Sequence, residues 1–198
     1  MTERKLIPEL QAHLEEISLR LGKLGIPVHA CIAGGMAVNY HTGYRMPSQV
    51  EMKWSHRVPI PPEMLAFPIP DPHVEDETII VSLDGLSDVQ GSYPPGWEQA
   101  APEISRAGQI IIHVMTPLDL AVSMIARSSD LDREDIKVLA QAGLIRSADL
   151  EERAAEALRQ YAGDTTFIMT NIRDAVDLVR AVEASPESSP AEHSPSCS

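Results

Sequence analysis

Apolar residues recur along the chain with two different periods, and the period predicts which segments are helices and which are strands. Apolar side chains three or four positions apart between Leu10 and Leu24 predict an amphipathic helix that ends within residues 22–27. The short segment 36–41 follows two glycines and predicts a second helix, closed by Gly43. Short apolar or alternating runs predict four strands, at residues 28–33, 48–54, 77–84 and 108–115.

Prolines and turn-forming residues interrupt this pattern in two places. Residues 58–74 contain six prolines, a density that excludes a helix or a central strand and predicts an extended surface segment. Residues 86–101 contain Gly and Pro together with two aromatic residues, and predict a loop.

The second half of the chain has a helical pattern throughout. Thr116 and Pro117 predict the cap and first position of a helix over 118–129. Further helices are predicted over 130–143, over 148–163 with Ser147 as its cap, and over 166–184. The chain therefore predicts an α+β fold: a mixed sheet with flanking helices in a domain of residues 1–115, a helical module of residues 116–184, and a disordered Ser/Pro-rich tail at 185–198.

Composition and charge restrict the classes of partner and compartment. The chain has 198 residues and a net charge of −13, which argues against non-specific binding to nucleic acids or anionic membranes. We find no apolar run approaching the roughly 20 residues that cross a bilayer, and no apolar signal core at the N-terminus, so we expect a cytoplasmic protein. Cys31 and Cys197 have such different surroundings in the sequence that we expect no disulfide between them.

Two features carry candidate chemistry. Gly34 and Gly35 lie between a predicted strand and a predicted helix, where glycine lets the backbone approach a phosphate and free N–H groups face it; the simpler alternative is a tight turn. On the next strand, Gln49, Glu51 and Lys53 share one face, because side chains two apart point the same way. Oxygen ligands placed so can hold Mg²⁺; the alternative is the solvent face of an edge strand.

The spacing of these features resembles a known signature. Gly34-Gly35, then thirteen residues, then Gln49-Val50-Glu51-Met52 resembles the motif of the nucleotidyltransferase superfamily, the polymerase-β-like fold. The resemblance implies that Gly34 and Gly35 hold a triphosphate and that positions 49 and 51 hold metal. It further implies a third carboxylate that helps to activate the attacking hydroxyl, for which Asp84 is the best candidate and Asp76 or Glu77 are alternatives.

A second segment is similar to one branch of that superfamily. Residues 114–145 resemble the C-terminal module of bacterial AbiEii-type nucleotidyltransferase-like proteins of toxin–antitoxin systems, at positions that include Pro117, Asp119, Arg127, Asp132 and Asp135. This resemblance implies that Arg127 and Asp135 brace a substrate cleft between the domain and the helical module, with Arg127 among the nucleotide-binding residues. The acidic residues around position 132 have an alternative interpretation, as caps of a helix.

The departures from the signature separate two hypotheses. The first metal position holds Gln49, whose uncharged amide is a weaker ligand than Asp, and Met124 stands where the family often has a phosphate-facing Lys. Lys53 could attract phosphates or be an ordinary surface charge. We therefore expect a catalytically impaired binding or regulatory protein, in a toxin–antitoxin system, with a nucleoside triphosphate or a toxin or antitoxin as its partner. The alternative is an active Mg²⁺-dependent enzyme that moves a nucleoside monophosphate to a protein or RNA hydroxyl.

Overall fold

The computed structural model describes residues 5–22, 26–70, 77–85, 93–161 and 165–185. The predicted disordered tail, from residue 186 on, and the alternative carboxylate Asp76 lie outside the described residues. The described strands are β1 (Val28–Ala33), β2 (Gln49–Trp54), β3 (Ala66–Pro70), β4 (Thr78–Gly85), β5 (Glu103–Ala107) and β6 (Ile110–Val114). The α-helices are α1 (Pro8–Leu21), α2 (Gly34–Thr42), α3 (Trp97–Ala100), α4 (Pro117–Ile125), α5 (Asp130–Gln141), α6 (Ser147–Leu158) and α7 (Thr166–Glu183).

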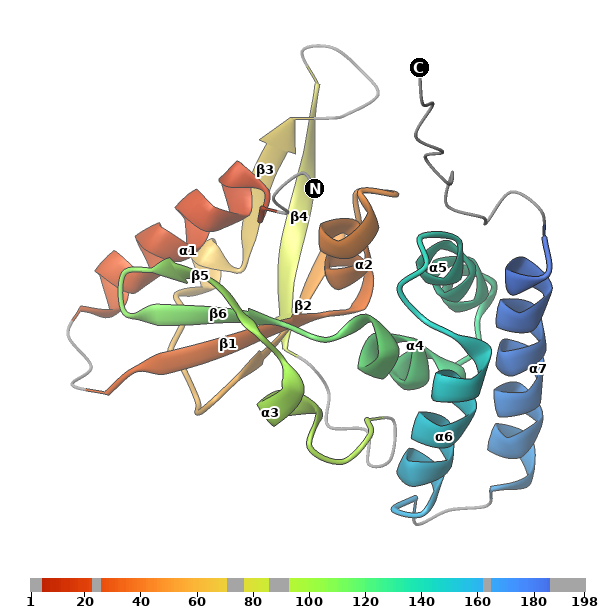
Figure 1. The fold of residues 1–198 in the computed structure, drawn as a ribbon. Helices are drawn as coiled ribbons and strands as arrows, with labels where there is room; N and C mark the ends of the chain where they lie inside the picture. The colour runs from red at the N-terminus through yellow and green to blue at the C-terminus, as the bar shows by residue number, and fades with distance from the viewer. Residues whose placement is uncertain (1–4, 23–25, 71–76, 86–92, 162–164, 186–198) are drawn as a thin grey trace, which may run out of the picture.

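The strands form one mixed six-stranded sheet in the order β3-β4-β2-β1-β6-β5 (Figure 1). The central pair β1–β2 is antiparallel, whereas β1–β6 and β2–β4 are parallel. The outer pairs β3–β4 and β5–β6 are antiparallel. The expectation of an α+β fold is therefore confirmed, with a mixed sheet in the N-terminal half and helices alone after β6.

The two faces of this sheet have opposite character because side chains alternate along each strand. On one face, Val28, Ala30 and Ile32 of β1 are fully buried. Helix α1 packs on this face through Leu10, Leu14 and Ile17, and its His13 stacks on Phe67 of β3 with ring centroids 4.5 Å apart. The opposite, polar face carries the alternate residues, which are His29 and Cys31 of β1, Gln49, Glu51 and Lys53 of β2, Ser82 and Asp84 of β4, and His113 of β6.

The helical module begins as the sequence predicts. Thr116 caps α4 by accepting a hydrogen bond from the Asp119 backbone N–H at 3.2 Å, with Pro117 at the first helical position. Ser129 and Asp132 form a reciprocal capping box at the start of α5. The prediction that Ser147 caps the next helix is wrong: Arg146 holds the cap position of α6, and the Ser147 hydroxyl donates instead to Glu183 of α7 at 2.6 Å.

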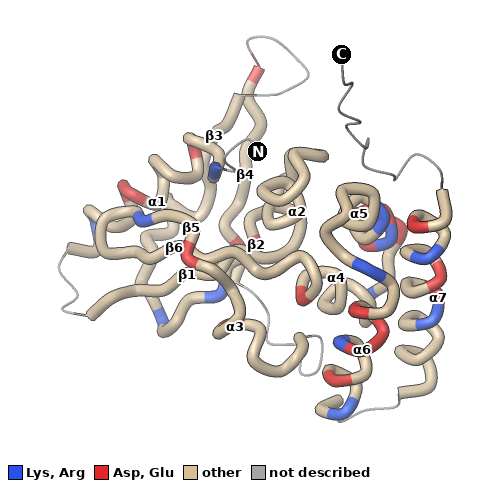
Figure 2. Tube along the Cα trace, viewed as in Figure 1, with Lys and Arg blue, Asp and Glu red and all other residues tan. Residues whose placement is uncertain are grey.

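Helices α4 to α7 lie together at one side of the sheet, next to α2 (Figure 1). Lys and Arg are interspersed with Asp and Glu along α5, α6 and α7 (Figure 2), as expected for helix faces that are exposed to solvent. None of the helices in the described ranges is long and apolar enough to cross a membrane.

Four described elements were not predicted as such: a 3-10 helix, β3, α3 and β5. The proline-rich segment contains a turn of 3-10 helix, Pro62–Met64, followed by β3, an edge strand that includes Pro68 and Pro70. The prediction that no central strand forms there is confirmed. The predictions that no helix forms and that the segment lies on the surface are wrong for the 3-10 turn and for Phe67 and Ile69, whose side chains are buried. The loop predicted before β6 contains α3, and β5 was not predicted at all.

Candidate functional site

The glycine turn and the strand carboxylate meet at one place. Gly34 starts α2 directly after β1, and Ala33 lies opposite Glu51 in the β1–β2 register. Gly34 has a φ of +56°, and a Cβ built on it would lie 2.6 Å from the carboxyl carbon of Glu51. Glycine is therefore favoured here, because a side chain would be strained on this backbone and would force the Glu51 carboxylate to move.

Glu51 lies in a partly dehydrated, highly charged environment. Burial raises the pKa of Glu51; the nearby Arg127 cation acts against this rise, and the Asp132 and Asp84 carboxylates add to it. Asp84 is the register partner of Glu51 on the parallel strand β4, so the two side chains lie next to each other on the polar face. The alternative candidate Glu77 precedes β4, at the end away from Glu51.

A cleft of about 200 Å³ opens at this point, between the sheet and α5. It is lined by Gly35 of α2, by Gln49 and Glu51 of β2, by Arg45, Pro47 and Ser48 from the loop between them, and by Arg127, Ser129, Leu131 and Asp135 from the helical module. A Cβ on Gly35 would lie 3.0 Å from a guanidinium nitrogen of Arg45, so the N-terminal turn of α2 approaches this arginine closely.

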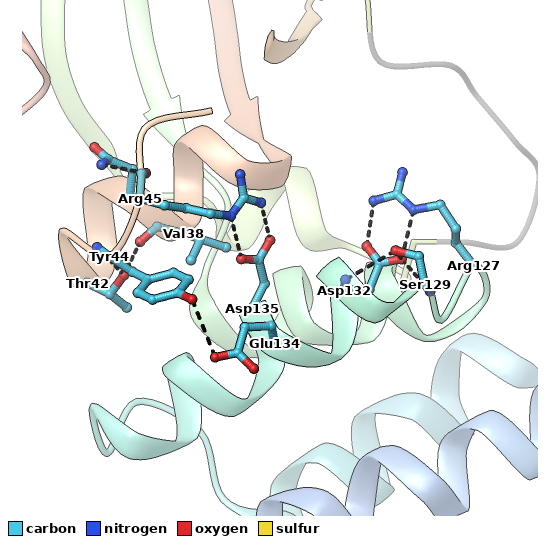
Figure 3. Close-up of polar contacts among 10 residues, drawn as sticks. Val38, Thr42, Tyr44, Arg45, Arg127, Ser129, Asp132, Glu134 and Asp135 are labelled. Atoms are coloured by element: carbon cyan, nitrogen blue, oxygen red, sulfur yellow. Dashed lines mark hydrogen bonds and ion pairs between the residues drawn. The ribbon is translucent and has the colours of Figure 1, made fainter. Parts of the chain in front are cut away.

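Two arginines reach the cleft from different parts of the chain, and one helix holds both (Figure 3). Arg45 donates from Nε and Nη2 to the two carboxylate oxygens of Asp135, at 3.0 and 2.6 Å. Arg127 donates through the same two nitrogens to Asp132, at 2.8 and 2.5 Å. Because Asp132 and Asp135 are three residues apart, they lie on one side of α5. Helix α5 therefore fixes the orientation of two cations with respect to one cleft.

The pair of Arg127 and Asp132 shifts the pKa values of both its members. The hydrogen bond with Asp132 raises the pKa of Arg127 further above its already high usual value. Burial alone would raise the pKa of Asp132, but hydrogen bonds from Arg127 and from Ser129 at the start of α5 bring it below its usual value. The Asp135 side chain is only 3% exposed, while that of Arg45 is 25% exposed and faces the cleft. Each bidentate pair leaves the third guanidinium nitrogen, Nη1, outside the bond to the carboxylate.

The structure brings most of the residues singled out in the sequence to this cleft. Gly35, Gln49, Glu51, Arg127 and Asp135 line it, with Gln49 exposed at its edge. The backbone of Gly34 lies close to the Glu51 carboxyl group, and Asp84 is the neighbour of Glu51 on β4.

Two other positions lie away from the cleft. Lys53 lines a separate hollow further along β2, where it pairs with Glu98 at 3.0 Å. Met124 is 3% exposed in the core, so it cannot face a phosphate. Arg45 is a cleft residue that the sequence pattern did not identify, because its partner Asp135 is 90 residues away.

The residues of the cleft fit a divalent cation only in part. Among the described residues, no group of three His, Cys, Asp or Glu side chains is arranged to hold a metal ion. Glu51 and Asp84 are two adjacent carboxylates, and Mg²⁺ is commonly held by one or two carboxylates together with substrate phosphates. Glu51 and Asp84 are therefore the side chains that would hold such an ion together with a phosphorylated ligand, with the Gln49 amide as a weak third oxygen.

Comparisons with known proteins add no assignment to this geometry. No model of a known protein family matches the chain, and a search of curated proteins found no match.

Proposed function

We propose that the chain is a nucleotidyltransferase-like protein that binds the phosphates of a nucleoside triphosphate in the cleft between the sheet and α5. The observation that supports this most directly is the convergence of a glycine turn, a strand carboxylate and two oriented arginines on one cleft. Backbone N–H groups at the start of α2 and the Nη1 atoms of Arg45 and Arg127 are the donors for phosphate oxygens.

We further propose that binding, rather than efficient transfer, is the main activity. Transfer of a nucleotidyl group needs charge stabilisation around the phosphate while a hydroxyl attacks and pyrophosphate leaves. In this chain Gln49 offers a neutral oxygen where the resembling signature has a carboxylate, so the site has one negative charge fewer with which to hold a metal ion. The cleft therefore suits a protein that binds a nucleotide and passes this state to a protein partner, such as the other member of a toxin–antitoxin pair.

The alternative is an active Mg²⁺-dependent nucleotidyltransferase, and one observation favours it. Asp84 and Glu51 lie side by side on adjacent parallel strands, so two carboxylates remain where metal and attacking hydroxyl would meet. In this alternative Glu51 and Asp84 bind Mg²⁺ together with the phosphates, and Asp84 helps to remove the proton from a protein or RNA hydroxyl.

Titration calorimetry tests the binding proposal. ATP, GTP, CTP and UTP are titrated into the full chain with and without Mg²⁺. We expect at least one of them to bind, and Arg45→Ala to weaken its binding about tenfold or more, because one charge-assisted contact to phosphate is lost. Arg180→Ala, which removes an arginine paired with Asp177 on exposed α7, is the matched control and leaves the affinity unchanged. No heat with any of the four nucleotides refutes the proposal.

A gain-of-function variant separates the two functions. Incorporation of label from α-³²P nucleotides into the chain itself, or into proteins and RNA of a cell extract, is measured for the natural chain and for Gln49→Asp. An impaired binder shows label only with Gln49→Asp, since the added carboxylate restores the missing ligand. Gln141→Asp, at an exposed position of α5, adds the same charge elsewhere and stays inactive. Labelling by the natural chain establishes the alternative instead.

A further inference from the structure

The polar face of the sheet has a second hollow that the proposed phosphate site does not use. It has a volume of about 250 Å³ and is lined by His29, Cys31, Lys53, Ser55, Glu98, Gln99 and His113. Lys53 lies two residues beyond Glu51 on the same face of β2, and Cys31 is its register partner on β1. Two residues of a strand span about 7 Å. The hollow therefore begins roughly one sugar ring away from the carboxylate of the cleft.

One wall of the hollow belongs to the segment of residues 93–99, whose Glu98 and Gln99 line it. Glu98 pairs with Lys53 of β2 at 3.0 Å. The Tyr93 and Trp97 rings lie 5.3 Å apart, and Lys53 lies over the Trp97 ring at 5.7 Å.

The helical module also holds this wall in place. Arg153 of α6 donates to the Pro95 carbonyl at 2.9 Å, and the same arginine pairs with buried Asp119 of α4 at 2.7 Å. The helical module therefore fixes the position of this wall, and strand β2 contributes side chains to both the hollow and the cleft.

A histidine pair gives the hollow a defined hydrogen-bonding character. His113 Nδ1 lies 3.1 Å from the Ala101 carbonyl, which can only accept, so Nδ1 carries the hydrogen. In the neutral ring His113 Nε2 then accepts from His29 Nδ1, 2.9 Å away. This leaves Nε2 of His29 as an acceptor. The two rings are stacked with centroids 5.2 Å apart, and the Gln99 amide adds a donor and an acceptor to the lining of the hollow.

We propose that this hollow binds the nucleobase of the nucleotide whose phosphates lie in the cleft. The inference rests on the proposed function, since it needs the phosphates at Gly35, Arg45 and Arg127. The hollow is smaller than the roughly 300–1,000 Å³ pockets of drug-sized ligands, so it fits one ring system. It offers neutral donors and acceptors beside a flat imidazole surface, which suits the edge and face of a base, and lies one ribose length from Glu51.

Comparison of a nucleotide with its phosphate chain alone tests the proposal. The tightest-binding nucleoside triphosphate and inorganic tripolyphosphate are each titrated, with Mg²⁺, into the full chain. We expect the nucleotide to bind at least about tenfold more tightly than tripolyphosphate, because a stacked and hydrogen-bonded base adds to the phosphate contacts.

Substitutions of residues that line the hollow test whether these residues contact the base. Gln99→Ala and His29→Gln are expected to reduce the nucleotide affinity severalfold and to leave tripolyphosphate binding unchanged. Gln160→Ala, at an exposed position outside α6, is the matched control. Circular dichroism and a thermal melt establish that each variant is folded, and the unchanged tripolyphosphate affinity is a second proof of an intact cleft.

The outcomes separate the two proposals. Equal affinities for nucleotide and tripolyphosphate, or nucleotide binding unaffected in both folded hollow variants, overturn the nucleobase site and leave the phosphate site standing. Binding of neither ligand refutes the phosphate site itself, and the nucleobase site with it.

Discussion

The two faces of the central sheet are built from the same strands but serve different purposes. Ile32 and Met52 on one face are at most 1% exposed and pack in the core, whereas Cys31 and Lys53, one residue away on each strand, face a hollow. Polar side chains on the second face do not strengthen the core, yet that face holds both the cleft and the hollow. We infer that the apolar face carries the stability and the polar face carries the binding.

The largest expected effect comes from the apolar face. Ile32→Ala removes a fully buried side chain from the centre of the sheet, and should lower the free energy of unfolding by about 2–5 kcal/mol. Gln49→Ala, exposed on the polar face, should change it by less than about 0.5 kcal/mol. Equilibrium unfolding in urea measures both. Similar losses for the two variants would contradict the division between the faces.

The second-largest loss of stability is expected at the contact between Gly34 of α2 and Glu51 of β2. Gly34→Ala places a Cβ 2.6 Å from the Glu51 carboxyl carbon on a left-handed backbone, so we expect a loss of about 1–3 kcal/mol in unfolding free energy. Part of this loss should disappear in the double variant Gly34→Ala/Glu51→Ala, because the clash is removed while the backbone strain remains. Purely additive losses in this double-mutant cycle would show that the two residues do not touch.

A smaller effect is expected from the ion pairs of α5. Asp135→Asn breaks the bidentate pair with Arg45 and should cost about 1–2 kcal/mol in unfolding free energy. This is less than the roughly 3–5 kcal/mol lost from a fully buried pair, because Arg45 is 25% exposed and can turn to water. Asp177→Asn is the control, since its 2.7 Å pair with Arg180 has both side chains more than half exposed. The control should change the stability by less than about 0.5 kcal/mol.

The smallest effect concerns the charge on Glu51. Burial raises its pKa above the usual 4.5, so the folded chain holds this proton more tightly than the unfolded chain. The stability that this provides is complete below pH 4.5 and is lost as the pH rises through the raised value. Glu51→Gln stays neutral, and should therefore be more stable than the natural chain at neutral pH and show no such advantage below pH 4.5. Urea unfolding at neutral pH and below pH 4.5 measures the free energy of unfolding of both chains, with Glu152→Gln at an exposed position of α6 as the control. A Glu51→Gln variant that is less stable than the natural chain at neutral pH would contradict the role of burial.

The sequence predicts the fold best where local pattern and tertiary burial agree. The strands β1, β2, β4 and β6 and the four C-terminal helices were all expected, because each has a clear apolar period or an N-terminal cap. Strand β5 was missed because its residues Glu103–Ala107 are mostly polar at an edge, and pairing with β6 rather than periodicity holds it in place. Helix α3 was missed because it has only four residues and directly follows Pro94, Pro95 and Gly96, which are typical of a loop.

The sequence indicated several residues of the candidate site, but not the contacts that distant segments of the chain make there. The resemblance to the nucleotidyltransferase signature implied that Gly34 and Glu51 share one site and made Asp84 the best candidate for a further carboxylate, and the structure places Glu51 beside both. The role of Arg45 depends on Asp135, and the hollow depends on residues from β1, β2, α3 and β6. Such groupings result from the packing of distant segments, which no local pattern specifies.

The edge strand β3 has a consequence for how the molecule behaves at high concentration. Two of its five residues, Pro68 and Pro70, have no amide hydrogen, so this margin of the sheet offers few donors to another chain. At the other margin, Gln11 of α1 already donates to the Arg106 carbonyl of β5 at 2.8 Å. Joining of two sheets edge to edge is therefore disfavoured at β3, and at β5 one backbone acceptor is already occupied.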